Sequence, residues 1–266
     1  MKESIFLRFT SFKDADRMCH VYSNSTEKLD IGANFLIHGI KNREKCIYIS
    51  DRIIPKEFIN RLSAAGIDPH KARKDGQLKE ITIPRKQQEE MKAPDSFISF
   101  LAPVIEDISK NSNIKLRILK TREGLLYNHD NLLRREALFD KFSSDKPVVY
   151  LCQHDIKKIG SQDLMSLFST HRMIVFHNNL YDSPFYTPPE EILEKLRQTS
   201  SKYELLTNKE REILRFIVNG CSNNEIADDI SISVRTVETH RANVMRKLEI
   251  NKLVDLVKFA IQNGIT

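Results

Sequence analysis

The chain has 266 residues, of which 40% are hydrophobic and 29% are charged, and its formal net charge is +6. This composition is typical of a globular protein and excludes a disordered one, while the basic excess permits binding to nucleic acid without requiring it. No apolar run reaches the roughly 18 residues that a membrane-spanning helix needs, and the first residues lack the core of a signal peptide, so we expect a cytoplasmic location.

The first two thirds of the chain alternate short β-rich runs with amphipathic stretches. Helical patterns such as Glu27–Gly39 and Pro55–Ala65 separate most of the runs, which predicts βαβ units and a mostly parallel sheet. Residues 84–95 are polar and bounded by proline, which predicts a loop or a frayed helix. The predicted strands are Ile5–Phe9, Cys46–Ser50, Leu78–Ile83, Lys115–Lys120, Pro147–Gln153 and Met173–His177.

Polar side chains follow several of these predicted strands. Ligands of an open parallel sheet bind beyond the carboxyl ends of its strands, so we expect a ligand pocket at that edge. The residues assigned to it are Ser50, Asp51, Arg122, Glu123, Cys152, His154 and Asp155.

Cysteine and histidine are the other candidate ligands. The four cysteines are Cys19, Cys46, Cys152 and Cys221, and they contain no CxxC pair, which favours reduced thiols over a disulfide framework. Cys46 and Cys152 lie within predicted strands, where small core residues are the simpler interpretation. Cys152 and His154, together with His171 and His177, fit no standard metal-ligand spacing, so no metal and no cofactor are expected.

Two phosphate-based functions are disfavoured. A phosphate loop needs a Gly-Lys pair, and none of the eight glycines is followed by lysine. A phosphorylated receiver domain would place Lys-Pro after a strand, whereas Lys146-Pro147 precedes one. We find no nucleophile–base pair with a triad signature and therefore expect no enzymatic activity.

A connecting helix follows the predicted sheet. Thr187 is a suitable N-cap, Pro188 and Pro189 suit a first turn, and together they predict a helix at about 189–199. The stretch "TSSKYE" reads as a linker. We therefore expect an α/β domain over residues 1–195, a linker over 196–204 and an all-α domain over 205–266.

The last segment has the signals of four short helices. Thr207 with Glu210, and Ser222 with Glu225, form capping boxes that mark two helix starts, and Gly220 suits a helix end. A third helix starts near Ser233. A fourth carries an apolar stripe, which consists of Leu253, Leu256, Val257, Ala260 and Ile261.

Only about five residues separate the second helix from the third, which predicts a helix-turn-helix unit whose third helix enters the major groove of DNA. The inner face of this third helix carries Val237, Val244 and Leu248, and its outer face carries Arg235, Glu238, Thr239, Ala242 and Arg246. Residues 206–266 contain 9 basic and 8 acidic residues, a net charge of only +1, whereas residues 235–247 alone have a net charge of +3. The local stripe therefore matters more than the total charge.

This segment resembles the LuxR-type (GerE/LuxR) helix-turn-helix domain, in the stretches "LTNKEREIL", "GCSNNEIADDISIS" and "TVETHRANVMRKLEI". The resemblance implies binding to double-stranded DNA with base contacts from Glu238, Thr239 and Ala242. Because a single small helix-turn-helix rarely buries enough surface alone, we expect a homodimer. It implies phosphate contacts from Ser233, Thr236, His240, Arg241 and Lys247, with packing at the helix edge as the alternative role of His240.

The first domain resembles the methanogen/methylotroph sensory (MEDS, DcmR-like) domain, in stretches such as "MCHVYSNSTEKLD", "FLIHGIKNREKCIYISD" and "VVYLCQHD". The resemblance implies a RecA/KaiC-like sheet without a phosphate loop, and the sensing of a small metabolite as effector. It adds Cys19 and Tyr22 to the candidate ligand-sensing residues, although Arg17 stands where relatives often have histidine. The alternative is a KaiC-like nucleotide-binding signalling protein whose helix-turn-helix contacts proteins.

Overall fold

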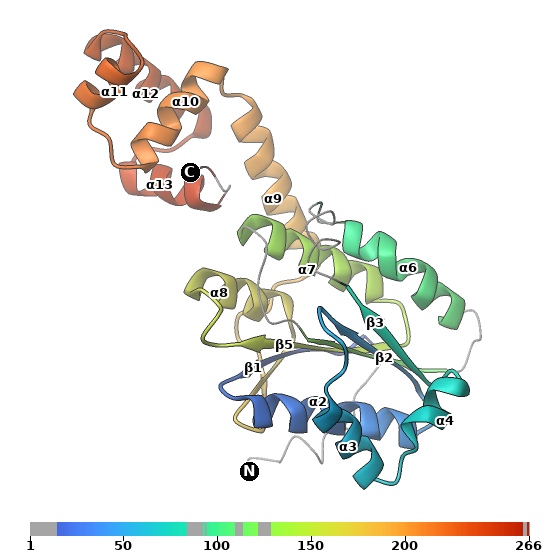
Figure 1. Ribbon diagram of the computed structural model, residues 1–266. Helices are drawn as coiled ribbons and strands as arrows, with labels where there is room; N and C mark the ends of the chain where they lie inside the picture. Colours follow the sequence, from blue (N-terminus) through green and yellow to red (C-terminus); the bar gives the residue numbers. More distant parts are fainter. Residues whose placement is uncertain are drawn as a thin grey trace. The chain divides into compact units, whose positions relative to one another are not determined.

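The computed structural model describes residues 15–83, 93, 95–109, 114–121, 129–262 and 265. The chain divides into two compact units, the first built mainly from residues up to Glu190 and the second from Glu191 onward. Figure 1 shows a layered α/β unit and a unit made of helices only. The expected fold class, an α/β domain followed by a helical one, is confirmed.

The α/β unit is built on a seven-stranded sheet of order β3-β2-β4-β5-β1-β6-β7. All neighbouring strands are parallel except β6 and β7, which are antiparallel. The strands are β1 (Arg17–Tyr22), β2 (Lys45–Ser50), β3 (Leu78–Thr82), β4 (Leu116–Thr121), β5 (Val148–Asp155), β6 (Met173–Phe176) and β7 (Asn179–Asp182).

Helices cover both faces of this sheet, as Figure 1 shows. One face packs against α2 (Ser25–Lys41), α3 (Lys56–Ala64) and α4 (Pro69–Lys74). The other face packs against α6 (Ser96–Ser109), α7 (His129–Ser143) and α8 (Ser161–Thr170). Because successive strand residues point to opposite faces, Met18 joins the first core and its neighbour Cys19 joins the second.

Five of the six predicted strands are present with ends shifted by one or two residues, while Ile5–Phe9 lies outside the described residues. The sequence did not predict β1 or β7. Strand β1 is buried along its whole length but contains Arg17 and His20, which hide the apolar pattern of a central strand. These two polar side chains are stable in the core because they have buried partners: Arg17 pairs with Glu136 and His20 with Gln153.

The helical unit contains α9 (Pro189–Glu204), α10 (Asn208–Val218), α11 (Asn223–Asp229), α12 (Val234–Leu248) and α13 (Leu253–Gln262). The stretch predicted to be a linker is helical, because no glycine or proline interrupts α9 before Glu204. Leu256 and Ala260 of the predicted α13 stripe are buried, but Leu253 is 48% exposed at the first turn, and the side chain of Ile261 is outside the description. None of the described helices has the length and apolar character needed to cross a membrane.

Candidate functional site

Both predicted capping boxes are formed. Thr207 accepts a hydrogen bond from the backbone N–H of Glu210, and the Glu210 carboxylate accepts one from the N–H of Thr207. Ser222 and Glu225 make the same reciprocal pair at the start of α11. These caps satisfy N–H groups that a helix leaves without partners, so they define where α10 and α11 begin.

The turn between α11 and α12 is short and specific. Ser231 adopts a positive φ of 53°, and the N–H of Ile232 bonds back to the carbonyl of Ala227. Ser233 then caps α12 by accepting from the N–H of Thr236. This arrangement sets the angle between the two helices and confirms the predicted helix-turn-helix.

The two faces of α12 differ as predicted. Val237, Val244 and Leu248 are buried in the core of the helical unit. The five outer-face residues predicted to meet DNA, namely Arg235, Glu238, Thr239, Ala242 and Arg246, are all exposed. The hydroxyl of Thr239 donates to the carbonyl of Arg235 at 2.9 Å, which leaves its oxygen able only to accept from a ligand.

The residues predicted to contact phosphates have partners of their own. Arg241 donates to Asn223 Oδ1 at 2.7 Å, which links α12 to α11. Lys247 Nζ lies 2.7 Å from Glu210 Oε2, and its side chain is 25% exposed. The hydroxyls of Ser233 and Thr236 bond each other at 2.7 Å, and His240 is half-buried.

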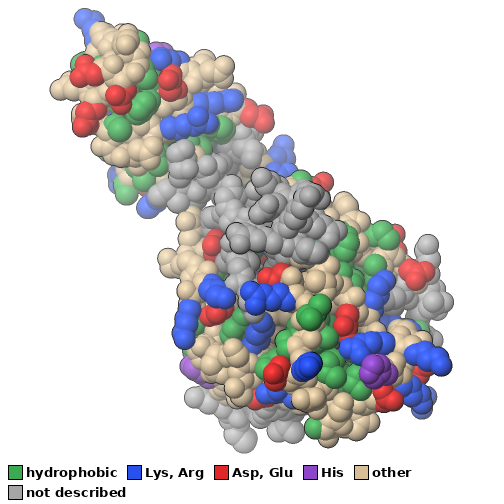
Figure 2. All heavy atoms as spheres, in the orientation of Figure 1, with side chains coloured by type: hydrophobic (Ala, Val, Ile, Leu, Met, Phe, Trp, Pro, Cys, Tyr) green, Lys and Arg blue, Asp and Glu red, His purple; other side chains and the backbone are tan. Residues whose placement is uncertain are grey.

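The charge of the visible face is mixed. Figure 2 shows acidic and basic side chains interspersed over the helical unit. This agrees with a net charge near zero over residues 206–266. Any attraction of this unit for a polyanion therefore depends on the local cations of α12, of which Arg235 and Arg246 are exposed.

The structure divides the predicted ligand-sensing residues among separate places. Cys19, Cys152 and His154 come together in the second core, beneath α7 and α8. Tyr22 and Asp155 are paired at the carboxyl ends of β1 and β5, with Lys28 of α2 over the Tyr22 ring. Ser50 is the last residue of β2 and Asp51 follows it, two strands away from this pair. Arg122 and Glu123 lie outside the described residues.

The start of α2 occupies the position that a phosphate loop would have after β1. Asn24 accepts from the N–H of Glu27, and the Glu27 carboxylate accepts from the N–H and the hydroxyl of Ser23. A carboxylate of the chain itself therefore fills the place where a helix N-terminus would otherwise attract an anion. The N–H groups of Ser23 and Glu27 are therefore already bonded within the chain.

A buried ionic cluster lies on the α7 side of the sheet. Glu136 accepts from Arg17 at 2.9 Å and from Lys120 at 3.1 Å, and Arg135 lies 3.5 Å away. Burial opposes the ionisation of Glu136, but the three cations outweigh burial and hold the pKa of this carboxyl well below its usual range. The sequence analysis did not assign Arg17 or Glu136 to a site, and charged residues inside otherwise apolar patterns were the available signal.

Cysteine and histidine side chains continue this cluster. Cys152 Sγ lies 3.1 Å from His171 Nε2 and 3.2 Å from His154 Nε2. Burial by itself would raise the pKa of Cys152, but the hydrogen bond from Cys19 and the two imidazoles outweigh it and place this pKa well below the usual value. Burial and the same hydrogen bond raise the pKa of Cys19.

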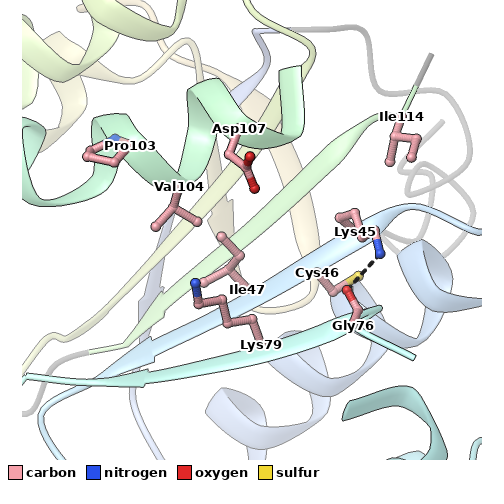
Figure 3. A pocket seen from close by; sticks show the side chains of 9 residues that line it. All are labelled: Lys45, Cys46, Ile47, Gly76, Lys79, Pro103, Val104, Asp107 and Ile114. Atoms are coloured by element: carbon pink, nitrogen blue, oxygen red, sulfur yellow. Dashed lines mark hydrogen bonds between the residues drawn. The ribbon is translucent and has the colours of Figure 1, made fainter. Parts of the chain in front are cut away.

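A hollow of about 570 Å³ opens at the amino ends of the strands, opposite to the predicted pocket. Figure 3 shows Lys45, Lys79 and Asp107 around it, together with Cys46 and Val104. Lys45 donates to the carbonyl of Gly76 at 2.9 Å. The sequence analysis did not single out this edge of the sheet.

Two family models match the chain. Residues 18–172 match the model described as "MEthanogen/methylotroph, DcmR Sensory domain". Residues 204–260 match the model described as "Bacterial regulatory proteins, luxR family". The second match covers α10, α11 and α12, so the helix-turn-helix described above is of the luxR type.

Curated relatives match over a quarter of the chain. The chain is 43% identical over 72 residues to the "Uncharacterized response regulatory protein YgeK" of Escherichia coli (strain K12), which is 27% of this chain and 49% of that protein. It is 40% identical over 79 residues to "Response regulator protein VraR" of Staphylococcus aureus (strain Mu3 / ATCC 700698), 28% of this chain and 38% of that one. The chain thus spans less than half the length of these relatives.

Two solved structures are also similar. The flagellar accessory protein FlaH from Methanocaldococcus jannaschii has 15% identity and a TM-score of 0.44, with 70% of this chain and 88% of that chain covered. The response regulator StyR has 15% identity and a TM-score of 0.29, with 82% and 98% covered.

Proposed function

The chain belongs to the family of the methanogen/methylotroph DcmR sensory domain, and we propose that it is a one-component regulator of transcription that binds duplex DNA through α12. The observation that carries this proposal is the exposed polar face of α12 directly after a turn of four residues, 230–233, whose last residue caps the helix. No catalytic step is part of the proposal.

Helix α12 enters the major groove with its first turns toward the bases. Glu238 accepts from a cytosine amino group, and Thr239 accepts from an adenine or cytosine amino group, because its own proton is already donated to Arg235. Ala242 leaves room for a base edge or a thymine methyl. Arg235 and Arg246 neutralise phosphates on either side of the groove.

The second group of phosphate contacts comes from the polar residues near the start of α12. The Ser233 and Thr236 hydroxyls and the His240 ring extend toward the DNA backbone. Arg241 reaches the backbone while it keeps its bond to Asn223. Lys247 contributes mainly through Glu210, because that ion pair already uses its ammonium group.

The regulator binds as a dimer on a two-fold operator. A single small helix-turn-helix buries little surface, and dimers read half-sites that lie about one helical turn apart. Leu253 and Val254, 48% and 56% exposed at the start of α13, supply apolar surface for a second copy. These two residues support the dimer because exposed neighbouring apolar side chains favour association.

The α/β unit senses a small effector and controls the helical unit. The alternative is a KaiC-like nucleotide-binding protein whose helices contact proteins. Two observations disfavour nucleotide: the chain has no Gly-Lys pair, and the N-terminus of α2 is capped by Asn24 and Glu27. Calorimetric titration of ATP into the full chain separates the two, since tight binding would favour the alternative.

The decisive experiment selects bound fragments from genomic DNA with the full-length protein at low salt. We expect a small set of fragments that share a two-fold sequence. The matched control is the double variant Arg235→Ala/Arg246→Ala, which keeps the fold because both side chains are exposed. Failure of the wild type to retain any fragment, with cell-extract metabolites present, contradicts the proposal.

A further inference from the structure

Cys19 and Cys152 stand side by side in the centre of the sheet. They occupy paired positions on the neighbouring parallel strands β1 and β5, and both belong to the core on the α6–α8 face. His154 lies two residues after Cys152 and therefore points to the same face. The pairing of two strands that are far apart in the sequence thus brings two sulfur atoms and one imidazole together.

The ligand atoms of these three residues all lie within 4.8 Å of one another. Cys19 and Cys152 are fully buried and His154 is 5% exposed. An ion bound by two sulfurs at about 2.3 Å and a nitrogen at about 2.0 Å would separate sulfur from nitrogen by about 3.5 Å. The distance from Cys152 Sγ to His154 Nε2 is 3.2 Å, which is within a few tenths of an ångström of that separation.

His171 contacts Cys152 but lies outside the group of three, so it becomes a fourth ligand only if its ring shifts toward the others. Its Nε2 lies 3.1 Å from Cys152 Sγ, and its Nδ1 lies 2.8 Å from the carbonyl oxygen of Leu167. Donation of the Nδ1 proton to that carbonyl leaves Nε2 as the unprotonated nitrogen that faces the sulfur. Metal-binding histidines commonly have this orienting contact on the second ring nitrogen.

The donor set determines the class of ion. Thiolates and imidazoles bind soft or borderline ions, whereas magnesium and calcium require oxygen ligands, and no carboxylate belongs to this group of three. We propose that Cys19, Cys152 and His154 bind a thiophilic ion with a filled d shell, zinc(II) or copper(I), and that His171 shifts toward the ion as the fourth ligand. The site is independent of DNA binding by α12.

Standard metal-ligand spacings do not reveal this site, because Cys19 is on β1 whereas Cys152 and His154 are on β5, more than 130 residues later. His177, which the sequence grouped with Cys152, is exposed and lies outside the buried group. The alternative interpretation is a metal-free core in which thiols and imidazoles only bond one another. The two interpretations differ in what the reduced protein binds.

The test uses full-length protein, reduced and freed of metal, with cobalt(II) as a spectroscopic probe for zinc(II) and a chromophoric chelator competing for copper(I). We expect the protein to bind one equivalent per chain of at least one of these ions. The cobalt-loaded protein should show a sulfur-to-metal charge-transfer band in its absorption spectrum. Cys19→Ser and Cys152→Ser should each weaken binding at least tenfold. Cys46→Ser is the matched control, since Cys46 is also buried in the sheet but belongs to the opposite core.

X-ray absorption of the loaded wild type provides a measurement that needs no variant, and we expect two sulfur neighbours and one or two nitrogen neighbours. Three results each overturn the proposal. The first is that the reduced wild type binds no stoichiometric cobalt, zinc or copper(I). The second is that the bound ion has no sulfur neighbour. The third is that a folded Cys19→Ser/Cys152→Ser variant binds the ion as tightly as the wild type does. Far-UV circular dichroism establishes whether that variant is folded.

Discussion

Lys247 at the end of α12 forms an ion pair with Glu210 in the first turn of α10, and Nζ and Oε2 are 2.7 Å apart. The same carboxylate oxygen accepts the N–H of Thr207 in the capping box. One buried carboxylate therefore fixes the start of one helix and the end of another. This relationship gives Lys247 a structural role at the carboxyl end of the helix that is proposed to read DNA.

Replacing Lys247 by methionine should destabilise the helical unit. The substitution leaves the carboxylate of Glu210 buried without its charged partner, which costs about 1–3 kcal/mol of the free energy of unfolding. Hydrogen exchange of peptides from α10 and α12 measures the loss. Because Lys247 is committed to Glu210, we expect the salt dependence of DNA binding to stay near that of the wild type, and a slope reduced by a full unit would contradict the structural role.

Arg235→Ala and Arg246→Ala should act on binding and not on stability. Both side chains are exposed on the outer face of α12, so each substitution should remove about one released counterion and lower the slope of log K against log salt by roughly 1. Fluorescence anisotropy over a series of salt concentrations measures the slope. Lys258→Ala is the control, because Lys258 is exposed on α13 and pairs with Asp255; equal effects at all three positions would argue against phosphate contacts by α12.

Thr239→Ala should change the preferred sequence more than the affinity for unrelated DNA. The hydroxyl of Thr239 donates its proton to the backbone carbonyl of Arg235, so it can only accept from a base. Alanine therefore removes one hydrogen-bond acceptor and one methyl contact from the groove. Loss of one base contact costs about 1–3 kcal/mol of discrimination at that position. Selection from random sites with wild type and variant makes the comparison, and identical site preferences would show that Thr239 reads no base.

Glu210 should make the stability of the helical unit depend on acid. Burial raises the pKa of this carboxyl, but the hydrogen bonds from Lys247 and Thr207 outweigh burial and lower it below the ordinary 4.5. The unfolded chain then binds more protons as the pH falls below about 4.5, so the stabilisation is present above that value and is lost as the pH falls through the folded-state pKa. Protection of α10 from hydrogen exchange in wild type and Glu210→Gln should differ at pH 6 and converge in acid; a constant difference would refute the assignment.

Glu136→Gln should destabilise the α/β unit strongly. Arg17, Lys120 and Arg135 share this carboxylate in the core, and its neutralisation leaves buried cations without a common anion, a loss of about 3–5 kcal/mol. Urea unfolding followed by circular dichroism measures it. The control is Asp145→Asn, since Asp145 pairs with Lys146 at the surface and should have little effect on stability.

Local chemistry allowed the sequence to predict most of the helical unit. The capping boxes at Thr207 and Ser222 and the apolar spacing of Val237, Val244 and Leu248 depend on residues three or four positions apart. Such signals can be read from the chain alone because the interactions form within one turn of a helix. The sequence predicted that α9 ends near residue 199, but the helix continues to Glu204. The polar residues after 199 include no glycine or proline, so no local signal stops the helix there.

What the sequence by itself determined was therefore the parallel α/β character of the first unit, the helix-turn-helix and the outer face of α12. Only the tertiary structure decided that Lys247 faces Glu210, that Glu136 gathers three cations, and that Cys19 lies beside Cys152 and His154. These contacts join residues far apart in the chain, and their partners depend on strand order and helix packing. A buried charge or thiol can be identified in a sequence, but its partner is chosen by the fold.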